Sequence, residues 1–335
     1  MSSGNKNMHA QQHLLSLMNQ AIEWRLIEMG LCCGVFDTLQ QPRALEDIAK
    51  AHHWQVAKTK HLLDGFVAMD IVECNASYFS MTNSYSALLS TTNECSMVAS
   101  LTHLNAIKLA SVEQLLELMA DNVSDTSHQV PFDSPVFWQV AAANLKSFHA
   151  STSAELYADI LQATPQWSQV KSMLDLGAGS AVLGQRLIRD NTQLHYHLFD
   201  LPPVVEAIKQ QLDSHTQMTL WQGNYNEAPL PQAVDLVLSA MSLYYAVDLD
   251  AVLKRCLSCL SANGMMISIH EGLTAARTQP AYHVIGRLLP VLKGNDLSFE
   301  RGKIAQSMLR VGFRHVSSEE ISTPFGPLHI DIGYK

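Results

Sequence analysis

The sequence lacks any run of apolar residues long enough to cross a membrane, since a spanning helix needs about 20 of them. Its first twelve residues are mostly polar and have no apolar core of the kind found in signal peptides. There are only 6 cysteines among 335 residues, and without a secretion signal they favour reduced thiols over a disulfide framework. Together these absences predict a cytoplasmic protein.

Positive charge is also scarce. The 22 Lys and Arg residues are outnumbered by 31 Asp and Glu residues, which gives a net charge of −9 and argues against nucleic acid as the main partner. The histidines are scattered and form no H-E-x-x-H pattern, so no metal site is expected. The single C-x-x-C pair, Cys256 and Cys259, lies in a helical pattern without a second pair to complete a metal or redox site.

The most informative segment present is a glycine-containing turn after an apolar run, Met173-Leu174-Asp175-Leu176-Gly177-Ala178-Gly179-Ser180-Ala181. Two glycines let the backbone turn sharply and leave no side chain over the turn, so a ligand can lie against the peptide. About twenty residues later a second apolar run ends in Asp200, where a βαβ unit presents a carboxylate to ribose hydroxyls. A dinucleotide site would need a third glycine where Val182 stands. The pattern predicts a nucleoside pocket at the C-terminal edge of a parallel sheet.

The N-terminal third is predicted to be mainly helical. Apolar spacing indicates a helix within 13–40, and shorter helices at 45–51 and 57–69 precede a hairpin of strands at 71–74 and 77–81. This order is that of a winged helix. Its candidate recognition helix carries acidic as well as basic residues, which favours a structural module over a DNA-binding one.

The rest of the chain divides into a helical and an alternating part. Residues 97–165 are predicted to be helical, with a break at 130–135. From residue 170 strands and helices alternate, which predicts a parallel sheet covered on both faces. Strands are expected at 172–176, 195–199, 217–221, 234–239, 264–270 and 313–320, and helices at 181–190, 203–213, 248–260 and 301–311.

These segments resemble the S-adenosylmethionine (SAM)-dependent small-molecule O-methyltransferases of plants and of bacterial antibiotic and pigment pathways. The resemblance covers nearly the whole chain, and its most selective piece is the Phe-Asp-Leu-Pro-Pro-Val segment that contains Asp200. It implies an α/β fold, a class I SAM-methyltransferase Rossmann-like parallel sheet with an N-terminal, mainly α, winged-helix-like dimerisation domain. The implied boundaries are 1–95 for the dimerisation domain, 96–165 for a helical connector lining the substrate cavity, and 166–335 for the SAM-binding domain.

The resemblance also implies a SAM pocket. Gly177 and Gly179 would lie under the amino acid and ribose of SAM, Asp200 would bind the ribose hydroxyls, and Leu201 would pack on adenine. Asn224 stands where the family usually has an aspartate that contacts the adenine amino group, and its amide oxygen can still accept a hydrogen bond. The remaining residues expected in this pocket are Asp175, Gly223, Tyr225, Ser239 and Ser153, the last matching a serine that binds the SAM carboxylate.

The segment expected to carry the catalytic base departs from the family. Relatives read Leu-His-Asp-Trp or Leu-His-His-Trp after the fourth strand, and the first histidine takes the substrate proton. Here Tyr244 holds that position and Tyr245 follows it. A tyrosine with a pKa of about 10 keeps its proton at neutral pH, so Tyr244 is a poor base and a good hydrogen-bond donor. The usual O-methylation mechanism therefore does not carry over directly.

Other polar residues are candidates for the missing role. The further catalytic candidates are His149, His270 and Glu271, and the expected substrate-cavity residues are Asn144, Phe148, Tyr245, His283 and Arg287. A single histidine is more commonly a satisfied core residue than a base, and alignment alone does not bring these groups into one cavity.

Three functions remain open at this point. The first is SAM-dependent methylation of a small aromatic or heteroaromatic metabolite whose nucleophile needs no histidine base. In the second, the same fold uses bound SAM for a reaction without methyl transfer, such as decarboxylation, hydroxylation or pericyclic rearrangement. The third is a non-enzymatic winged-helix regulator, against which the acidic charge balance argues. The apolar helix near the N-terminus predicts a homodimer.

Overall fold

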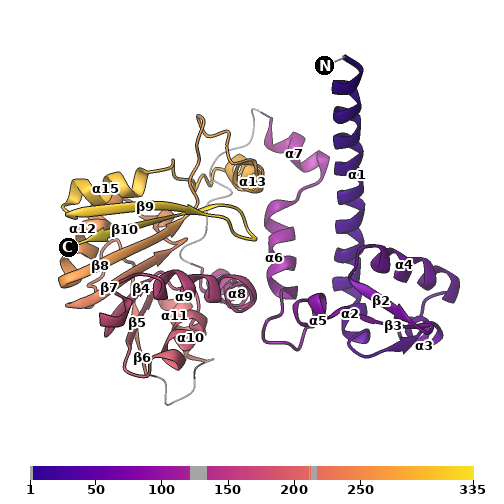
Figure 1. Ribbon diagram of the computed structural model, residues 1–335, viewed down its shortest axis with the longest axis horizontal. Coiled ribbons are helices and arrows are strands. Elements are labelled where there is room, and N and C mark those ends of the chain that lie inside the picture. Colours follow the sequence, from indigo (N-terminus) through magenta and orange to yellow (C-terminus); the bar gives the residue numbers. More distant parts are fainter. Residues whose placement is uncertain (1–2, 121–133, 211, 213–216) are drawn as a thin grey trace. The chain divides into compact units, whose positions relative to one another are not determined.

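The computed structural model describes residues 3–120, 134–210, 212 and 217–335 (Figure 1). The chain divides into two compact units, residues 1–102 and 103–335. No helix in the described ranges is long and apolar enough to span a membrane. The break expected at 130–135 falls almost entirely outside the described residues.

The first unit consists of helices around a small antiparallel sheet of order β1-β3-β2. The long first helix begins at Ser3, before the predicted residue 13, and ends at Cys33, where Gly34 adopts a left-handed φ of 71°. The helices and hairpin expected between 45 and 81 are present, whereas the two-residue strand β1, which pairs with β3, was not predicted. The elements are α1 Ser3–Cys33, α2 Val35–Thr38, β1 Arg43–Ala44, α3 Leu45–Ala51, α4 Val56–Ala68, β2 Val72–Asn75, β3 Tyr78–Met81 and α5 Asn83–Leu89.

The second unit is built on a seven-stranded sheet of order β6-β5-β4-β7-β8-β10-β9. The first five strands in this order are parallel, and β10 runs antiparallel to both β8 and β9. The strands are β4 Ser172–Leu176, β5 His195–Asp200, β6 Met218–Gln222, β7 Val234–Ala240, β8 Leu260–His270, β9 His315–Ile321 and β10 Leu328–Tyr334.

The predicted parallel sheet is present, and β10 adds to it one antiparallel strand that the sequence-based prediction did not include. Strand β10 escaped prediction because its core positions include polar side chains, His329 and Asp331, which break the apolar pattern. Asp331 is buried and accepts a hydrogen bond from Ser318 Oγ at 2.5 Å, so its burial becomes tolerable only once β9 is paired beside it.

Helices cover both faces of this sheet (Figure 1). One face carries α8 to α11 over a core that includes Met173, Leu198 and Ile267. The other carries α12 and α15 over Leu174, Val237 and Met266. The alternation of Met173 and Leu174 between faces follows the two-residue period of a strand buried on both sides. The helices are α10 Val182–Asp190, α11 Pro202–Lys209, α12 Leu249–Cys259, α13 Ala281–Gly286, α14 Leu288–Leu292 and α15 Lys303–Val311.

The helical segment before the sheet contains a local irregularity. The helices are α6 Val98–Lys108, α7 Val112–Leu118, α8 Pro135–Phe148 and α9 Ala154–Gln162. Between α8 and α9 the backbone continues as a π-helix, His149–Ser153. Such single-turn π segments are rare and occur frequently at functional sites, so the side chains of this turn are relevant to the site.

Candidate active site

The glycine turn after β4 has the geometry that the sequence predicts. Gly177 and Gly179 have φ values of 74° and 67°, a region that favours glycine. A Cβ at Gly177 would lie 2.6 Å from Ser242 Cβ, and one at Gly179 would lie 2.9 Å from Leu145 Cδ1. Both the backbone angles and the available space therefore require glycine, and the turn leaves its peptides uncovered by side chains of its own.

Asp200 closes this turn from the neighbouring strand. Its carboxylate accepts the Gly179 N–H at 2.7 Å on one oxygen and the Leu201 N–H at 2.7 Å on the other. Burial raises the pKa of Asp200 to about 6, and the two N–H donors oppose that rise. With this pKa the group is mostly ionised at pH 7. Each oxygen keeps a second lone pair, so the carboxylate can still accept hydrogen bonds from the two hydroxyls of a ribose.

Asp175 lies behind the turn rather than at its surface. The side chain is buried, and its carboxylate accepts a hydrogen bond from the Tyr196 hydroxyl at 2.5 Å. Burial raises the pKa of Asp175 to about 7. Gly184 makes room for this pair, because a Cβ there would lie 2.7 Å from the Tyr196 ring. Asp175 therefore supports the turn indirectly: its backbone belongs to β4, which leads into the turn, and its side chain binds Tyr196 of β5.

The π-helix contributes two polar groups near the turn. His149 Nδ1 lies 2.7 Å from the Ser180 hydroxyl, and burial lowers the pKa of His149 to about 4, so this imidazole is neutral at pH 7. Ser153 is fully buried, and among the residues that the structure describes its hydroxyl has no hydrogen-bond partner. The Tyr157 hydroxyl lies near the Ser153 hydroxyl, but the two groups do not reach hydrogen-bonding geometry. A buried hydroxyl without a partner costs stability, which suggests that a ligand completes this site.

The loop after β6 forms the third side of the nucleoside site. The Gly223 N–H donates to the Asp200 carbonyl at 2.9 Å, which holds this loop beside the β5 end. Tyr225 is buried, and its hydroxyl donates to the Ser242 carbonyl at 2.8 Å. Asn224 is exposed, and its side-chain oxygen accepts from Asn226.

Ser242 connects the strand ends beneath the site. Its hydroxyl donates to the Leu176 carbonyl at 2.6 Å and lies 2.7 Å from that of Ser239, which is completely buried. The preceding residue, Met241, has a positive φ of 54°, which is uncommon for a residue with a side chain. Ser239 thus lies below the site, and its hydroxyl is linked to the site by the contact with the Ser242 hydroxyl.

Tyr244 lies in a short 3₁₀ turn, Leu243–Tyr245, that follows β7. Its hydroxyl accepts the Glu271 N–H at 3.0 Å and lies 3.4 Å from the Met241 sulfur. Its ring stacks on Phe299 at 5.2 Å, and the Arg287 guanidinium lies 4.6 Å from the ring centre. Burial, and then the Glu271 charge, raise the pKa of Tyr244 above its ordinary value, so the phenol is protonated at neutral pH.

His270 has both ring nitrogens engaged. Its Nε2 accepts the backbone N–H groups of Ser242 at 3.2 Å and Leu243 at 3.0 Å. Because these donors are backbone amides, Nε2 must be unprotonated, and Nδ1 carries the proton toward Ser268 Oγ at 2.8 Å. Burial lowers the pKa of His270 to about 3. With this lone pair occupied, His270 is arranged to hold the Tyr244 turn.

Glu271 faces two basic side chains from the segment after the sheet. It forms a salt bridge with Arg287 Nε, and His283 Nδ1 lies 3.5 Å from its other oxygen. His283 is buried and its Nε2 lies 2.6 Å from the Pro327 carbonyl, so this nitrogen must carry a proton. Arg287 also donates to the Leu297 carbonyl at 2.6 Å. Tyr244, Glu271, His283 and Arg287 therefore form one cluster.

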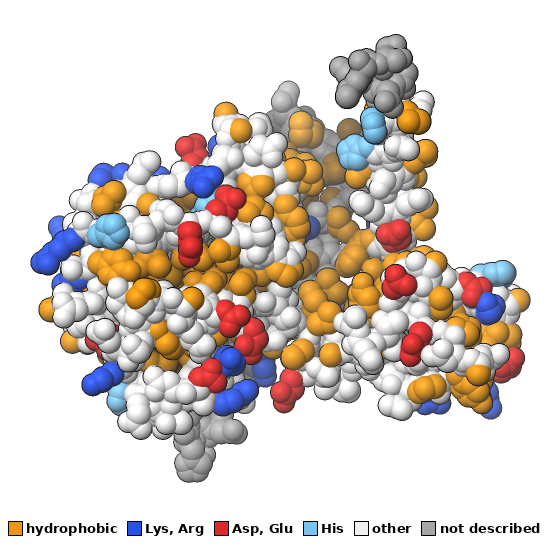
Figure 2. Space-filling view, viewed as in Figure 1, with side chains coloured by type: hydrophobic (Ala, Val, Ile, Leu, Met, Phe, Trp, Pro, Cys, Tyr) orange, Lys and Arg blue, Asp and Glu red, His pale blue; other side chains and the backbone are white. Residues whose placement is uncertain are grey.

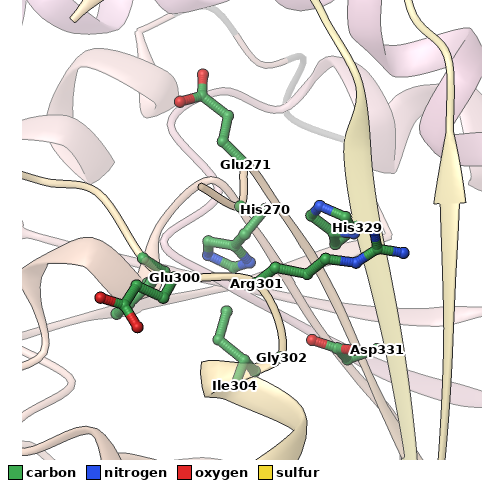
Figure 3. Close-up of a pocket in the computed structure, with 10 residues that line it drawn as sticks. His270, Glu271, Glu300, Arg301, Gly302, Ile304, His329 and Asp331 are labelled. Atoms are coloured by element: carbon green, nitrogen blue, oxygen red, sulfur yellow. The ribbon is translucent and has the colours of Figure 1, made fainter. Parts of the chain in front are cut away.

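The adjoining cavity is too small for a substrate. Figure 3 shows it below the end of β8, where the His270 ring faces it and the Glu271 side chain points away from the other labelled groups. It has room for about one water molecule.

The remaining predicted cavity residues occupy separate positions. Phe148 lies at the end of α8 and packs edge-to-face on Phe325, with ring centres 5.2 Å apart. Asn144 lies one turn earlier on α8 and is partly exposed. Tyr245 follows Tyr244, and its carbonyl accepts from Asn226 Nδ2 at 3.2 Å. Sequence reasoning missed Ser242 and Asn226, because their partners are far along the chain and neither belongs to a local motif.

Comparison with known proteins agrees with this geometry. The O-methyltransferase domain family matches residues 138–293. The 8-O-methyl transferase TcmO of tetracenomycin polyketide synthesis from Streptomyces glaucescens is 23% identical over 174 residues. That match spans about half of this chain and half of the length of TcmO.

Solved structures extend the similarity to the whole fold. Human N-acetylserotonin methyltransferase, crystallised with SAM, has a TM-score of 0.76 at 19% identity and covers 97% of both chains. Mitomycin 7-O-methyltransferase MmcR has a TM-score of 0.67 at 17% identity and covers 99% of this chain and 100% of its own. The fold is thus that of class I SAM methyltransferases, and the resemblance inferred from the sequence is confirmed over residues 138–293, which match the O-methyltransferase domain family.

Proposed function

We propose that the chain binds SAM across the C-terminal ends of β4, β5 and β6 and transfers its methyl group to a small aromatic or heteroaromatic molecule. The observation that carries the proposal is the Asp200 carboxylate, bonded to the amide of a left-handed Gly179 at the ends of two adjacent parallel strands. In folds of this kind a carboxylate so placed receives ribose hydroxyls. TcmO and the solved relatives above support methyl transfer to oxygen as the reaction class.

The described residues fit the whole of SAM. Gly177 and Gly179 place no side chain of their own between the turn and the ribose and amino acid part of SAM, and the Ser153 hydroxyl, unpaired among the described residues, is available to its carboxylate. When bound, SAM supplies a methyl group that is already electrophilic on a positively charged sulfur. The protein's remaining task is to bring a nucleophile into line with that methyl group and to exclude water.

The candidate bases are poorly suited to removing a proton from a substrate. His149 and His270 have lowered pKa values, both ring nitrogens of His270 and Nδ1 of His149 have hydrogen-bond partners, and Glu271 is paired with Arg287. Tyr244 keeps its proton. We therefore infer that the substrate's nucleophile is an acidic phenol, a thiolate, an amine or an enolate carbon, which reacts without a strong base.

Within the cluster, each side chain has a positioning role. The Tyr244 hydroxyl accepts the backbone N–H of Glu271 and so fixes the backbone position of this residue. Arg287 binds the Glu271 carboxylate and faces the Tyr244 ring. A fixed guanidinium next to an aromatic wall stabilises negative charge on a substrate oxygen. His270 holds the Tyr244 turn through two backbone amides.

A second function is favoured by the tyrosine at position 244. Since no histidine base stands at Tyr244, a reaction that uses bound SAM only as a fixed positive charge would also be compatible with this cluster. Decarboxylation, hydroxylation and pericyclic rearrangement are the reactions of that kind expected for this fold. The two functions differ in their products, because only methyl transfer forms S-adenosylhomocysteine (SAH).

The first unit is proposed to form a homodimer. Leu14, Met18 and Ile22 of α1 are 65%, 62% and 54% exposed, and their spacing of four residues places them on one stripe of the helix. Figure 2 shows hydrophobic side chains at the surface of this helix. Leu26 and Ile27 of the same helix pack on the core of their own unit. An apolar stripe of this extent is more consistent with a covering partner than with solvent, and a second copy supplies a matching stripe.

The decisive experiment has two steps. Isothermal titration calorimetry with SAM and SAH tests the cofactor site, and absence of binding of both at millimolar concentration would refute the proposal. Incubation with SAM and a panel of acidic phenols, thiols and heteroaromatic amines, followed by mass spectrometry, then tests the reaction. A product heavier by one methyl group, formed together with SAH, establishes transfer and excludes the second function.

A further inference from the structure

We infer that the nucleoside site reads the purine with a hydrogen-bond donor at Asn224, where an aspartate would supply an acceptor, so that the 6-amino group of adenine contributes little to cofactor affinity. The inference rests on the proposed binding of SAM. It concerns the polarity of one side chain, which the network around Asn226 determines.

The orientation of the Asn226 amide follows from a backbone donor. The Val247 N–H donates to Asn226 Oδ1 at 2.8 Å. Because a backbone amide can only donate, the atom that receives it must be the oxygen. The Asn226 nitrogen therefore lies on the other side, where it donates to the Tyr245 carbonyl at 3.2 Å and to Asn224 Oδ1 at 2.8 Å. Both acceptors are consistent with this assignment.

The orientation of the Asn224 amide follows in the same way. The Asn226 backbone N–H donates to Asn224 Oδ1 at 3.0 Å, so this atom is also an oxygen. It receives two hydrogen bonds, one from the backbone and one from the side chain of Asn226. Its two lone pairs are thus engaged, and the group that Asn224 can offer to a ligand is its NH₂.

The position of Asn224 relates this polarity to the purine base. β6 pairs in parallel with β5, with Gln222 opposite Asp200, and Asn224 follows two residues later. The Gly223 N–H donates to the Asp200 carbonyl at 2.9 Å, so Asn224 begins one residue from the strand end whose carboxylate would hold the ribose, within reach of a base attached to that ribose. The Asn224 side chain is exposed at this edge and can therefore meet the base.

The consequence distinguishes asparagine from aspartate. An aspartate at 224 would accept the same two bonds from Asn226 on one oxygen and keep a charged second oxygen for the adenine amino group. With asparagine the second atom is a donor, which opposes the amino group and can serve only an acceptor such as N1 of the purine. Removing the amino group from the ligand should then cost the wild-type protein little.

The test compares two ligands by isothermal titration calorimetry: SAH and its 6-deamino analogue, which carries purine in place of adenine. For the wild-type chain we expect the two dissociation constants to agree within about threefold. For Asn224→Asp we expect SAH to bind at least about tenfold more tightly than the analogue, since a hydrogen bond to a charged group contributes about 1.5–3 kcal/mol.

A second variant tests the network itself. Asn226→Ala removes the side-chain donor to Asn224 and the side-chain acceptor for Val247 but keeps the backbone donor at 226. One lone pair of Asn224 Oδ1 then becomes free to accept the adenine amino group, and the preference for SAH should rise above the wild-type value. Wild-type protein that binds SAH tenfold more tightly than the analogue would overturn the inference, as would an Asn224→Asp variant with the wild-type ratio. If neither ligand binds the wild-type chain, the proposed cofactor site is wrong and this inference falls with it.

Discussion

At the scale of single residues, Tyr244 shows how a change of side chain alters the chemistry open to a site. A histidine at this position could exchange a proton with a substrate near neutral pH. The tyrosine has a raised pKa, and its hydroxyl already accepts the Glu271 amide. We therefore expect Tyr244 to act by positioning: its hydroxyl fixes the backbone of Glu271, which is paired with Arg287, and its ring forms one aromatic wall of the cluster.

Substituting Tyr244 tests this role. Tyr244→Phe keeps the ring but leaves the Glu271 N–H without its partner, so we expect kcat to fall about ten- to a hundredfold, the scale of one hydrogen bond to a partly charged group. Loss of a general base would cost up to about 10⁴-fold. Turnover should be measured with the acceptor found by mass spectrometry, with SAH affinity as the control. Complete inactivity of Tyr244→Phe with normal SAH binding would show that Tyr244 is the base.

Ser153 allows stability and binding to be separated. Its buried, unpaired hydroxyl costs the free protein about 1–3 kcal/mol. We expect Ser153→Ala to leave the free energy of unfolding unchanged or higher, while SAH affinity falls about three- to tenfold through one lost hydrogen bond. Urea denaturation and calorimetry measure the two quantities.

The same turn offers a matched control for this substitution. Ser151 donates to the Ser147 carbonyl at 2.7 Å, so its hydroxyl is already satisfied within the helix. Ser151→Ala should leave SAH affinity unchanged. If Ser153→Ala bound SAH as tightly as the wild-type chain, Ser153 would have no role in the site.

The predictability of the site from sequence follows the range of its interactions. Gly177, Gly179 and Asp200 were recognisable because their spacing reflects one βαβ unit, which is local in the chain. Ser242 and Asn226 were not, because their roles depend on partners from other strand ends. His270 illustrates a further limit: its place after β8 was predicted, but only the structure reveals two backbone amides on its lone pair.

At the scale of elements, periodicity predicted the strands with apolar cores and failed where polar residues are buried. β4, β5 and β7 are strongly apolar and were predicted within one residue of their observed bounds. β10 was missed because the burial of its Asp331 depends on Ser318 in β9. The start of α1 was also mispredicted, since its first turns carry few apolar residues.

The β4–β5 pair gives a pH-dependent prediction through the buried Asp175–Tyr196 contact. The pKa of Asp175 is about 7 in the folded protein and about 3.9 in an unfolded chain. Between pH 4 and 7 the folded state therefore holds a proton that the unfolded chain has released, and this group makes stability fall as pH rises through that window. Above pH 7 its cost is constant.

Asp175→Asn tests this assignment. The amide oxygen can still accept the Tyr196 hydroxyl, but there is no proton to lose. The melting temperature of the variant should therefore exceed that of the wild-type chain by a margin that grows from pH 5 to pH 7.5, as followed by circular dichroism. A constant difference across this range would mean that Asp175 has an ordinary pKa in the fold.

At the scale of the whole molecule, the two compact units make different demands on their surfaces. The second unit covers both faces of its sheet with helices and encloses its apolar residues in two continuous cores. The first unit has a small core to which α1 contributes only its last turns. The outer half of α1 therefore has apolar side chains that its own unit does not bury, and we expect a second copy of the chain to cover them.

Substitutions on this stripe test the proposed dimer. Leu14→Ser, Met18→Ser and Ile22→Ser together remove its apolar surface without touching Leu26 or Ile27, which stabilise the core. Sedimentation velocity should then give a mass near the single-chain value of 37.1 kDa, against about twice that mass for the wild-type protein. Gln12→Ser with Asn19→Ser is the control on the same helix and should leave the mass unchanged. Wild-type protein that sediments as a monomer at tens of micromolar would refute the dimer, whereas deletion of residues 1–30 would be a weaker test, because it also removes core contacts.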